Sequence, residues 1–259
     1  MNDGDMQKNT EEVPFVPYVA EAFAGDDDKR KKKRILFIPL IIAVVLGLIY
    51  LIMTMQKKNN FYQKTLADLS FDYRNGETVL DDDDSIKPGA LASEISESIQ
   101  NHGVSIDTVS YYLNRDRTLS NDIAEYQFTR SGEGDTAEIT IGTVDAISSS
   151  TETVRRTGSG TKILKHGDWE NAAGIALPMI YEFCFLSESN NRIDISCDSA
   201  YETFVSSKKY TCEIWLMQSG GTYFTLYRYY NGGTLKAVRV LNSNDDLMCV
   251  YEIKDYSTL

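Results

Sequence analysis

Residues 210–230 read YTCEIWLMQSGGTYFTLYRYY, and this stretch decides which fold the sequence predicts. Two runs rich in β-branched and aromatic residues lie on either side of Ser219-Gly220-Gly221. Such runs favour strands, and adjacent glycines favour the tight turn that joins two antiparallel strands. In the first run, Cys212, Ile214 and Leu216 fall on one face of the expected strand. The stretch therefore predicts a β-hairpin with that face in a core.

Strand patterns continue on both sides of this hairpin. Apolar and polar residues alternate from Val104 onward, over 123–129, 137–144, 151–156, 161–165, 192–197, 235–241 and 247–253. Before them, Pro88 opens an expected helix in which Leu91, Ile95 and Ile99 form one apolar stripe. Residues 172–186 fit either a helix or a strand. The expected fold class is α+β, mainly antiparallel β: a curved sheet with one or two packed helices.

The order of these elements resembles the LolA-like superfamily. It consists of a helix, a first meander, a break and a second meander that starts with the 210–230 hairpin. That superfamily comprises outer-membrane lipoprotein carriers and relatives such as the periplasmic sensor RseB. The likeness covers about residues 87–255. The resemblance implies lipid binding or sensing. The soluble carriers of this superfamily lack a membrane anchor such as the one described next, so a tethered role is implied.

Residues 35–55 carry no charge and directly follow six basic residues, 29–34. A helix of this length spans roughly 31 Å at about 1.5 Å per residue, which matches a bilayer core of about 30 Å. The basic flank predicts a cytoplasmic N-terminus, and no Ala-x-Ala site follows that would favour a cleaved signal peptide. We expect a single-pass, type II protein of the cell membrane. Its parts are a cytoplasmic flexible tail (1–34), a transmembrane helix (35–55), a juxtamembrane helix and acidic linker (56–86) and an extracytoplasmic mainly-β domain (87–259).

The charge balance restricts the partners of this domain. The chain has 38 acidic and 26 basic residues and a net charge of −12. Nucleic acid and anionic surfaces are repelled at long range by such a protein, so no nucleic-acid partner is expected. Residues 56–259 contain no Asn-x-Ser/Thr sequon, which leans toward a bacterial source.

Four cysteines lie in the last third of the chain: Cys184, Cys197, Cys212 and Cys249. An even number on the oxidising side of a membrane suggests two disulfides, in any of three connectivities, and four buried free thiols are the alternative. Their spacing includes no Cys-x-x-Cys pair, so no metal site and no cofactor are expected.

The tail carries one apolar island, in which Phe15, Tyr18 and Phe23 are the aromatic residues. A short extended motif of this kind suits docking on a cytoplasmic partner, and a spacer with incidental apolar residues is an equal alternative.

Catalytic signatures are weak in this sequence. Asp168 and Glu170 flank Trp169 and would allow glycoside chemistry, although a polar turn is the simpler interpretation. The best candidates for a ligand or partner surface are aromatic residues of the 210–230 hairpin, with core packing as the alternative: Trp215, Tyr223, Phe224, Tyr227, Tyr229 and Tyr230.

The function expected from the sequence is that of a membrane-anchored extracytoplasmic binding or sensing module, non-enzymatic, which holds an apolar ligand or a protein partner. The alternative is a structural component of a bacterial cell-surface complex, recruited through its anchor and cytoplasmic tail. A hydrolase that uses Asp168 and Glu170 is a third hypothesis.

Overall fold

The computed structural model describes residues 39, 41–53, 61–80, 86–99, 102–143, 149–172 and 177–259. The chain divides into two units, residues 1–54 and residues 55–259. In the first unit, residues 41–53 are helical and carry large apolar side chains that are exposed. Within the part of the chain that the structure describes, no helix combines the length and the apolar character needed to cross a membrane. The expected span, 35–55, extends beyond these described residues.

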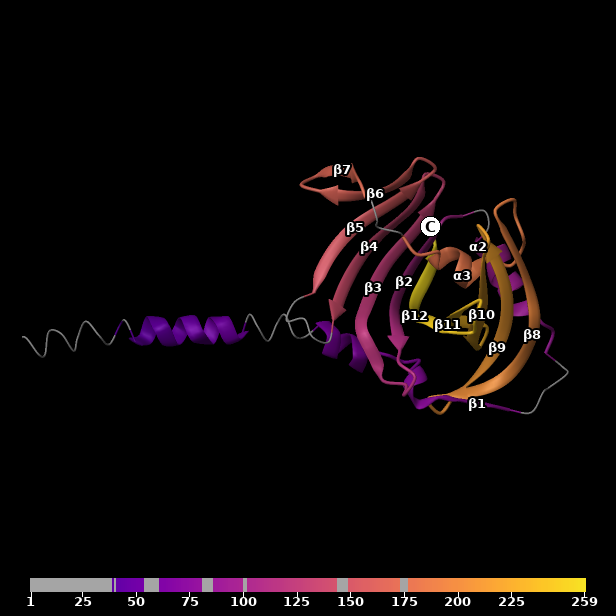
Figure 1. Ribbon diagram of the computed structural model, residues 1–259, viewed down its shortest axis with the longest axis horizontal. Helices are drawn as coiled ribbons and strands as arrows, with labels where there is room; N and C mark the ends of the chain where they lie inside the picture. Colours follow the sequence, from indigo (N-terminus) through magenta and orange to yellow (C-terminus); the bar gives the residue numbers. More distant parts are fainter. Residues whose placement is uncertain are drawn as a thin grey trace, which may run out of the picture. The chain divides into compact units, whose positions relative to one another are not determined.

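The second unit is built on one twelve-stranded antiparallel sheet (Figure 1). Its strands are β1 (Glu77–Val79), β2 (Val104–Leu113), β3 (Leu119–Ser131), β4 (Gly134–Thr143), β5 (Ser150–Thr157), β6 (Gly160–Lys165), β7 (Asp168–Asn171), β8 (Ile193–Val205), β9 (Lys208–Ser219), β10 (Thr222–Asn231), β11 (Thr234–Asn242) and β12 (Leu247–Thr258). Helices α2 (Ala90–Ile99) and α3 (Ile180–Phe185), the short 3₁₀ helix η1 (Tyr73–Asn75) and a helical stretch over residues 61–67 accompany the sheet. The prediction of a mainly antiparallel sheet with few helices is confirmed.

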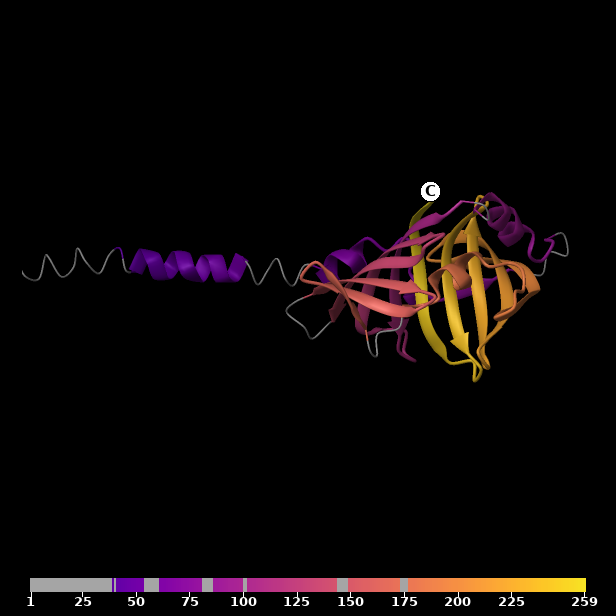
Figure 2. The same cartoon turned by 90° about the horizontal axis from the view of Figure 1, so that it is seen from above.

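Two meanders make up this sheet. Strands β2 to β7 follow one another as neighbours, and so do β8 to β12. The last strand, β12, pairs with β2 and thereby joins the two meanders, while β1 pairs with β8 at one edge. Figure 1 shows the sheet curled around α3, and Figure 2 shows the long strands of the second meander side by side.

The two faces of the sheet carry separate cores. On β9, Trp215 and Met217 belong to the first core, together with residues of α2 and α3. Tyr210 and Cys212 point to the other face and belong to the second core. The right-handed twist of a wide sheet makes each face concave along a different diagonal, so each face can hold one packed core.

Residues 61–79 cover the second core. Phe71 is fully buried there and contacts the rings of Tyr73, Tyr210 and Tyr229. The carboxylate of Glu252 holds this segment: it accepts hydrogen bonds from the Ser70 amide at 2.6 Å and from the Phe71 amide at 3.1 Å. The described residues 61–79 therefore belong to the same unit as the sheet, although a boundary at residue 87 was expected, because Phe71 and Tyr73 are buried in the second core.

Two local expectations also change. Residues 168–171, expected in a turn, form the edge strand β7. Within the ambiguous stretch 172–186, residues 180–185 form helix α3, because Ile180, Phe183 and Cys184 lie at helical spacing and are buried.

Candidate binding site

The 210–230 hairpin forms as predicted and positions the candidate site. Gly220 and Gly221 both have positive φ, +56° and +82°, as a two-residue hairpin turn requires. Register pairs Leu216 with Thr225 and Gln218 with Tyr223. Because side chains alternate along strands, Leu216 and Tyr223 project from the same face, which is the face of the second core.

A hollow of about 500 Å³ lies at this end of the hairpin, and we call it the hairpin hollow. Its lining comprises Asp194, Ile195, Ser196, Leu216, Met217, Gln218, Tyr223, Phe224, Thr225, Asn242, Ser243 and Asp245. Leu216 is 46% exposed and Tyr223 is 56% exposed. The segment 61–79 covers this face nearer the other end of the strands, so these two apolar side chains remain uncovered within the described structure.

Two of the six predicted surface aromatics, Tyr223 and Phe224, line the hairpin hollow. Phe224 also packs on Phe183 of α3, with ring centroids 5.3 Å apart, so its position is fixed by the first core. Tyr227 is half-buried and lies under the guanidinium of Arg239 at 3.8 Å from the ring centroid. Only Tyr223 therefore offers a freely accessible ring.

The other three predicted aromatics belong to the cores. Trp215, Tyr229 and Tyr230 are each at most 2% exposed. Trp215 packs against Arg228, and the Tyr229 hydroxyl donates to Glu77 at 3.1 Å. Their assignment to a ligand surface is wrong, because α3 covers one face of the hairpin and residues 61–79 cover the other.

Two buried charged residues, which the sequence analysis missed, fix the helices behind the hairpin. Glu213 accepts a hydrogen bond from the Leu91 amide in the first turn of α2 at 3.1 Å and another from the Trp215 indole at 3.0 Å. Arg228, directly opposite on β10, donates to the carbonyl oxygens of Phe183 and Leu186 at the end of α3, both at 2.8 Å. A carboxylate at a helix N-terminus and a guanidinium at a C-terminus complement the exposed backbone groups and the helix dipole. Both charges therefore serve to position helices.

A second anchor for α3 is an ion-pair cluster. Arg130 donates to Asp135 at 2.6 Å and to Glu182 of α3 at 2.6 Å, and Arg156 also pairs with Asp135. Burial of Asp135 opposes ionisation, but the hydrogen bonds from Arg130 and Arg156 outweigh it and lower the pKa of this carboxyl. The helix is thus tied to the first meander as well as to the second.

All four cysteines are free thiols, so the two expected disulfides are absent. Cys184 lies in the first core with Cys197 and Cys249 packed against it, whereas Cys212 lies in the second core. The sheet separates Cys212 from the other three, so four cysteines placed in this way have no route to two disulfides.

The third hypothesis, a hydrolase that uses Asp168 and Glu170, concerns residues at the surface. Asp168 and Glu170 are exposed on the edge strand β7, and Glu170 lies 3.9 Å from Lys165. Neither lines the hollows at the hairpin. Among the described residues, no three His, Cys, Asp or Glu side chains are grouped so that they could hold a metal ion. The tail motif of Phe15, Tyr18 and Phe23 lies outside the described residues.

Comparison with solved structures gives matches at low sequence identity. No protein-family model and no curated protein matches this chain. The Pseudomonas aeruginosa MucA/MucB complex matches with 13% identity and a TM-score of 0.31, over 66% of this chain and 56% of that chain. A putative lipoprotein from Parabacteroides distasonis matches with 10% identity and a TM-score of 0.24, over 61% and 97%. A putative exported protein with a YmcC-like fold from Bacteroides fragilis matches with 13% identity and a TM-score of 0.21, over 61% and 96%.

This chain spans little more than half the length of the MucB chains that it matches.

Proposed function

We propose that this chain is a membrane-anchored, extracytoplasmic binding module that takes an apolar side chain of a protein partner into the hairpin hollow. The observation that carries this proposal is the uncovered pair of Leu216 and Tyr223, 46% and 56% exposed, beside a hollow of about 500 Å³. Small-ligand and side-chain sites have volumes of about 300–1,000 Å³. An exposed apolar pair at such a hollow favours binding over catalysis.

Rigidity of the hairpin supports the proposal. Phe224 is fixed on α3, and Arg228, which follows it on β10, is hydrogen-bonded to the end of the same helix. A preformed site loses little conformational entropy when a partner binds. Tyrosine is well suited to such a site because it offers a large contact area for two rotatable side-chain bonds.

The rim of the hollow suggests the chemistry of the partner. Asp194 and Asp245 line it together with the polar side chains of Ser196, Gln218 and Asn242. Interfaces commonly combine an apolar centre with a polar rim, and two carboxylates favour a basic neighbour. The preferred partner segment therefore has an apolar side chain flanked by lysine or arginine.

The proposed anchor rests on the sequence of residues 29–55 and on the helix at 41–53. In that helix, the large apolar side chains are between 47% and 70% exposed, and they include Ile41, Leu46 and Tyr50. A helix that is apolar on every side is typical of a protein interior or a bilayer. The preceding six basic residues favour a cytoplasmic N-terminus, which places the β domain outside.

Site-specific photocrosslinking in living cells tests both parts of this proposal. A benzophenone amino acid replaces Tyr223 in one full-length variant and Tyr112, an exposed tyrosine on β2, in the control. Because only Tyr223 lines the hairpin hollow, we expect one discrete protein adduct at 223 and none at 112. The adduct should stay in membranes washed with alkaline carbonate.

Three results would contradict parts of the proposal. The same pattern of adducts at residues 223 and 112 would show that the hairpin hollow is not the binding site. A lipid adduct at residue 223 would show that the ligand is an apolar molecule and not a protein. Release of the protein by carbonate would show that it is not anchored in the membrane.

A further inference from the structure

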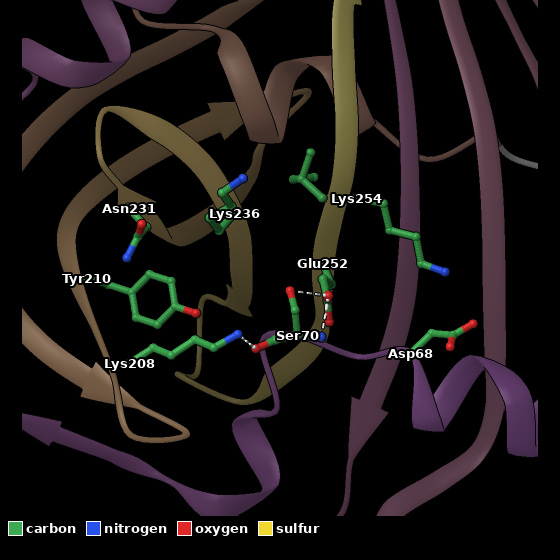
Figure 3. A pocket seen from close by; sticks show the side chains of 9 residues that line it. Asp68, Ser70, Lys208, Tyr210, Asn231, Lys236, Glu252 and Lys254 are labelled. Atoms are coloured by element: carbon green, nitrogen blue, oxygen red, sulfur yellow. Dashed lines mark hydrogen bonds between the residues drawn. The ribbon is translucent and has the colours of Figure 1, made fainter.

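A second hollow, the lysine hollow, lies where residues 68–70 cross the face of the second core. Its volume is about 510 Å³, and its lining includes Lys208 of β9, Lys236 of β11 and Lys254 of β12. Figure 3 shows Lys208 and Tyr210 on one side of it, Lys254 and Asp68 on the other, and Ser70 and Glu252 between them. Three ammonium groups from three strands thus gather in a protein whose net charge is −12.

Two carboxylates, Asp68 and Glu252, line this hollow together with the three lysines, and no ion pair among the described residues joins either carboxylate to a lysine. Both oxygens of Glu252 are occupied, by the Ser70 amide and hydroxyl at 2.6 and 2.7 Å and by the Phe71 amide at 3.1 Å. Lys254 is paired with Glu125 at 3.3 Å. Lys236 has no hydrogen bond or ion pair with any described residue, and Lys208 reaches only the Ser70 carbonyl, at 3.5 Å. Two ammonium groups therefore remain available to a ligand.

Tyr210 supplies an independent observation. The residue is 3% exposed, and its ring packs against Phe71 with centroids 5.3 Å apart. Its hydroxyl points toward the middle of the hollow in Figure 3, and no described group bonds to it. Burial and the nearby Glu252 raise the pKa of this phenol, so it stays protonated and serves as a donor at neutral pH. The donor is held rigidly by the core and is aimed at the position that a ligand would occupy.

We infer that the lysine hollow binds a phosphate-type anion, held by the ammonium groups of Lys208 and Lys236 and the hydroxyl of Tyr210. Charge-assisted hydrogen bonds to oxyanions are among the strongest that side chains make, and lysine recognises phosphate as a point charge. The anion is either free phosphate or the phosphomonoester headgroup of a lipid. This site is separate from the hairpin hollow and does not depend on the proposed partner.

Calorimetric titration of the full chain in a non-ionic detergent tests this inference. The first titrant is inorganic phosphate and the second is short-chain dihexanoyl phosphatidic acid, which presents the same group on a lipid. The test variants are Lys208→Gln/Lys236→Gln and Tyr210→Phe. The control is Lys209→Gln/Lys165→Gln, which removes the same charge from two exposed lysines that pair with Glu202 and Glu170, away from the hollow.

We expect the double test variant to bind about tenfold more weakly or worse, because it loses two charge-assisted bonds, and Tyr210→Phe to bind about threefold more weakly. The control should stay within about twofold of the natural chain, since long-range charge is screened by salt. Binding of both titrants identifies free phosphate as sufficient, and binding of phosphatidic acid alone identifies a lipid headgroup. Absence of binding to both titrants, or equal weakening in test and control variants, would overturn the inference. Tyr210→Phe keeps the ring of the core residue, so it decides the question even if the double variant fails to fold.

Discussion

Arg228 and Glu213 illustrate how single buried charges determine the arrangement of this domain. They face each other on neighbouring strands, and each is bound to the end of a helix instead of to solvent. Burial of a charged side chain costs free energy unless hydrogen bonds satisfy the charge. Unpaired backbone N–H and C=O groups at helix ends can supply these bonds, and they are satisfied in return. The open ends of α2 and α3 provide those groups, and the hairpin thereby receives its helical support.

At the residue scale, we predict that Arg228→Met destabilises the domain by about 3–5 kcal/mol, because three carbonyl oxygens at the end of α3 lose their donor. Urea unfolding of the full chain in detergent measures this. The matched control is Arg192→Met, an exposed arginine just before β8, which should change stability by less than about 0.5 kcal/mol. Equal unfolding midpoints for the two variants would show that Arg228 does not hold α3.

At the scale of elements, the segment of residues 61–79 differs most from a simple connection. It contributes a helical stretch over residues 61–67, η1 and the edge strand β1, and it closes the second core with Phe71 and Tyr73. Glu77 of β1 accepts hydrogen bonds from the hydroxyls of Tyr201 at 2.9 Å and Tyr229 at 3.1 Å. The segment is thus bonded to β8, β10 and β12, and it acts as the cover of one face of the sheet.

Phe71→Ala should therefore cost about 3–5 kcal/mol, as is usual when a fully buried aromatic side chain is removed. Val79→Ala on the same segment, where Val79 is 58% exposed, should cost less than about 1 kcal/mol. Hydrogen exchange distinguishes the two cores: the amides of β1 should lose protection in Phe71→Ala, while those of α3 keep it. Similar exchange in both variants would show that residues 61–79 are only a linker.

Local patterns and distant contacts differ in how well they can be predicted from this sequence. The hairpin was predictable because alternation and the Gly220-Gly221 turn are signals of adjacent residues. The cover by residues 61–79 was not, because its anchor on Glu252 joins residues 182 positions apart. Parity within the strands did indicate that Cys212 faces away from Trp215, but it does not relate the faces of separate strands, so it left the pairing of the four cysteines open.

The site was predictable in the same partial way. Tyr223 was found by its aromatic neighbourhood, whereas Leu216 was assigned to a core face with Cys212 and Ile214. Leu216 does lie on the face of the second core, but residues 61–79 do not extend over it. No local sequence pattern indicates how far such a covering segment extends. Glu213 and Arg228 were missed because charged residues are normally exposed and nothing nearby in the sequence signals a buried helix end.

At the scale of the whole molecule, one sheet carries two cores that contain thiols and phenols. Burial raises the pKa of Cys184, Cys249 and Tyr126 to about 12, and it raises those of Cys212 and Tyr229 as well. In the unfolded chain the pKa is about 8.5 for cysteine and about 10 for tyrosine. Above those values the unfolded state binds fewer protons than the folded state, so stability falls as pH rises.

We therefore expect the urea midpoint of the full chain to be unaffected by these groups below about pH 8 and to decrease steadily between about pH 8.5 and 11. Cys249→Ala should make this decrease shallower, because one buried thiol no longer titrates. A midpoint that stays constant to about pH 11 would contradict the burial of these groups.

The attachment of residues 61–79 also determines how the domain would respond to tension on its N-terminal side. A pull that enters at residue 61 first loads the hydrogen bond from the Tyr62 hydroxyl to the Ser120 carbonyl, and next the bonds from Ser70 and Phe71 to Glu252. It then loads β1, whose three residue pairs with β8 open one after another. The ladders of the two meanders bear the load only after this entry segment has peeled away. A stretched tether would thus gain slack from its own cover before it deformed the hairpin that carries Tyr223.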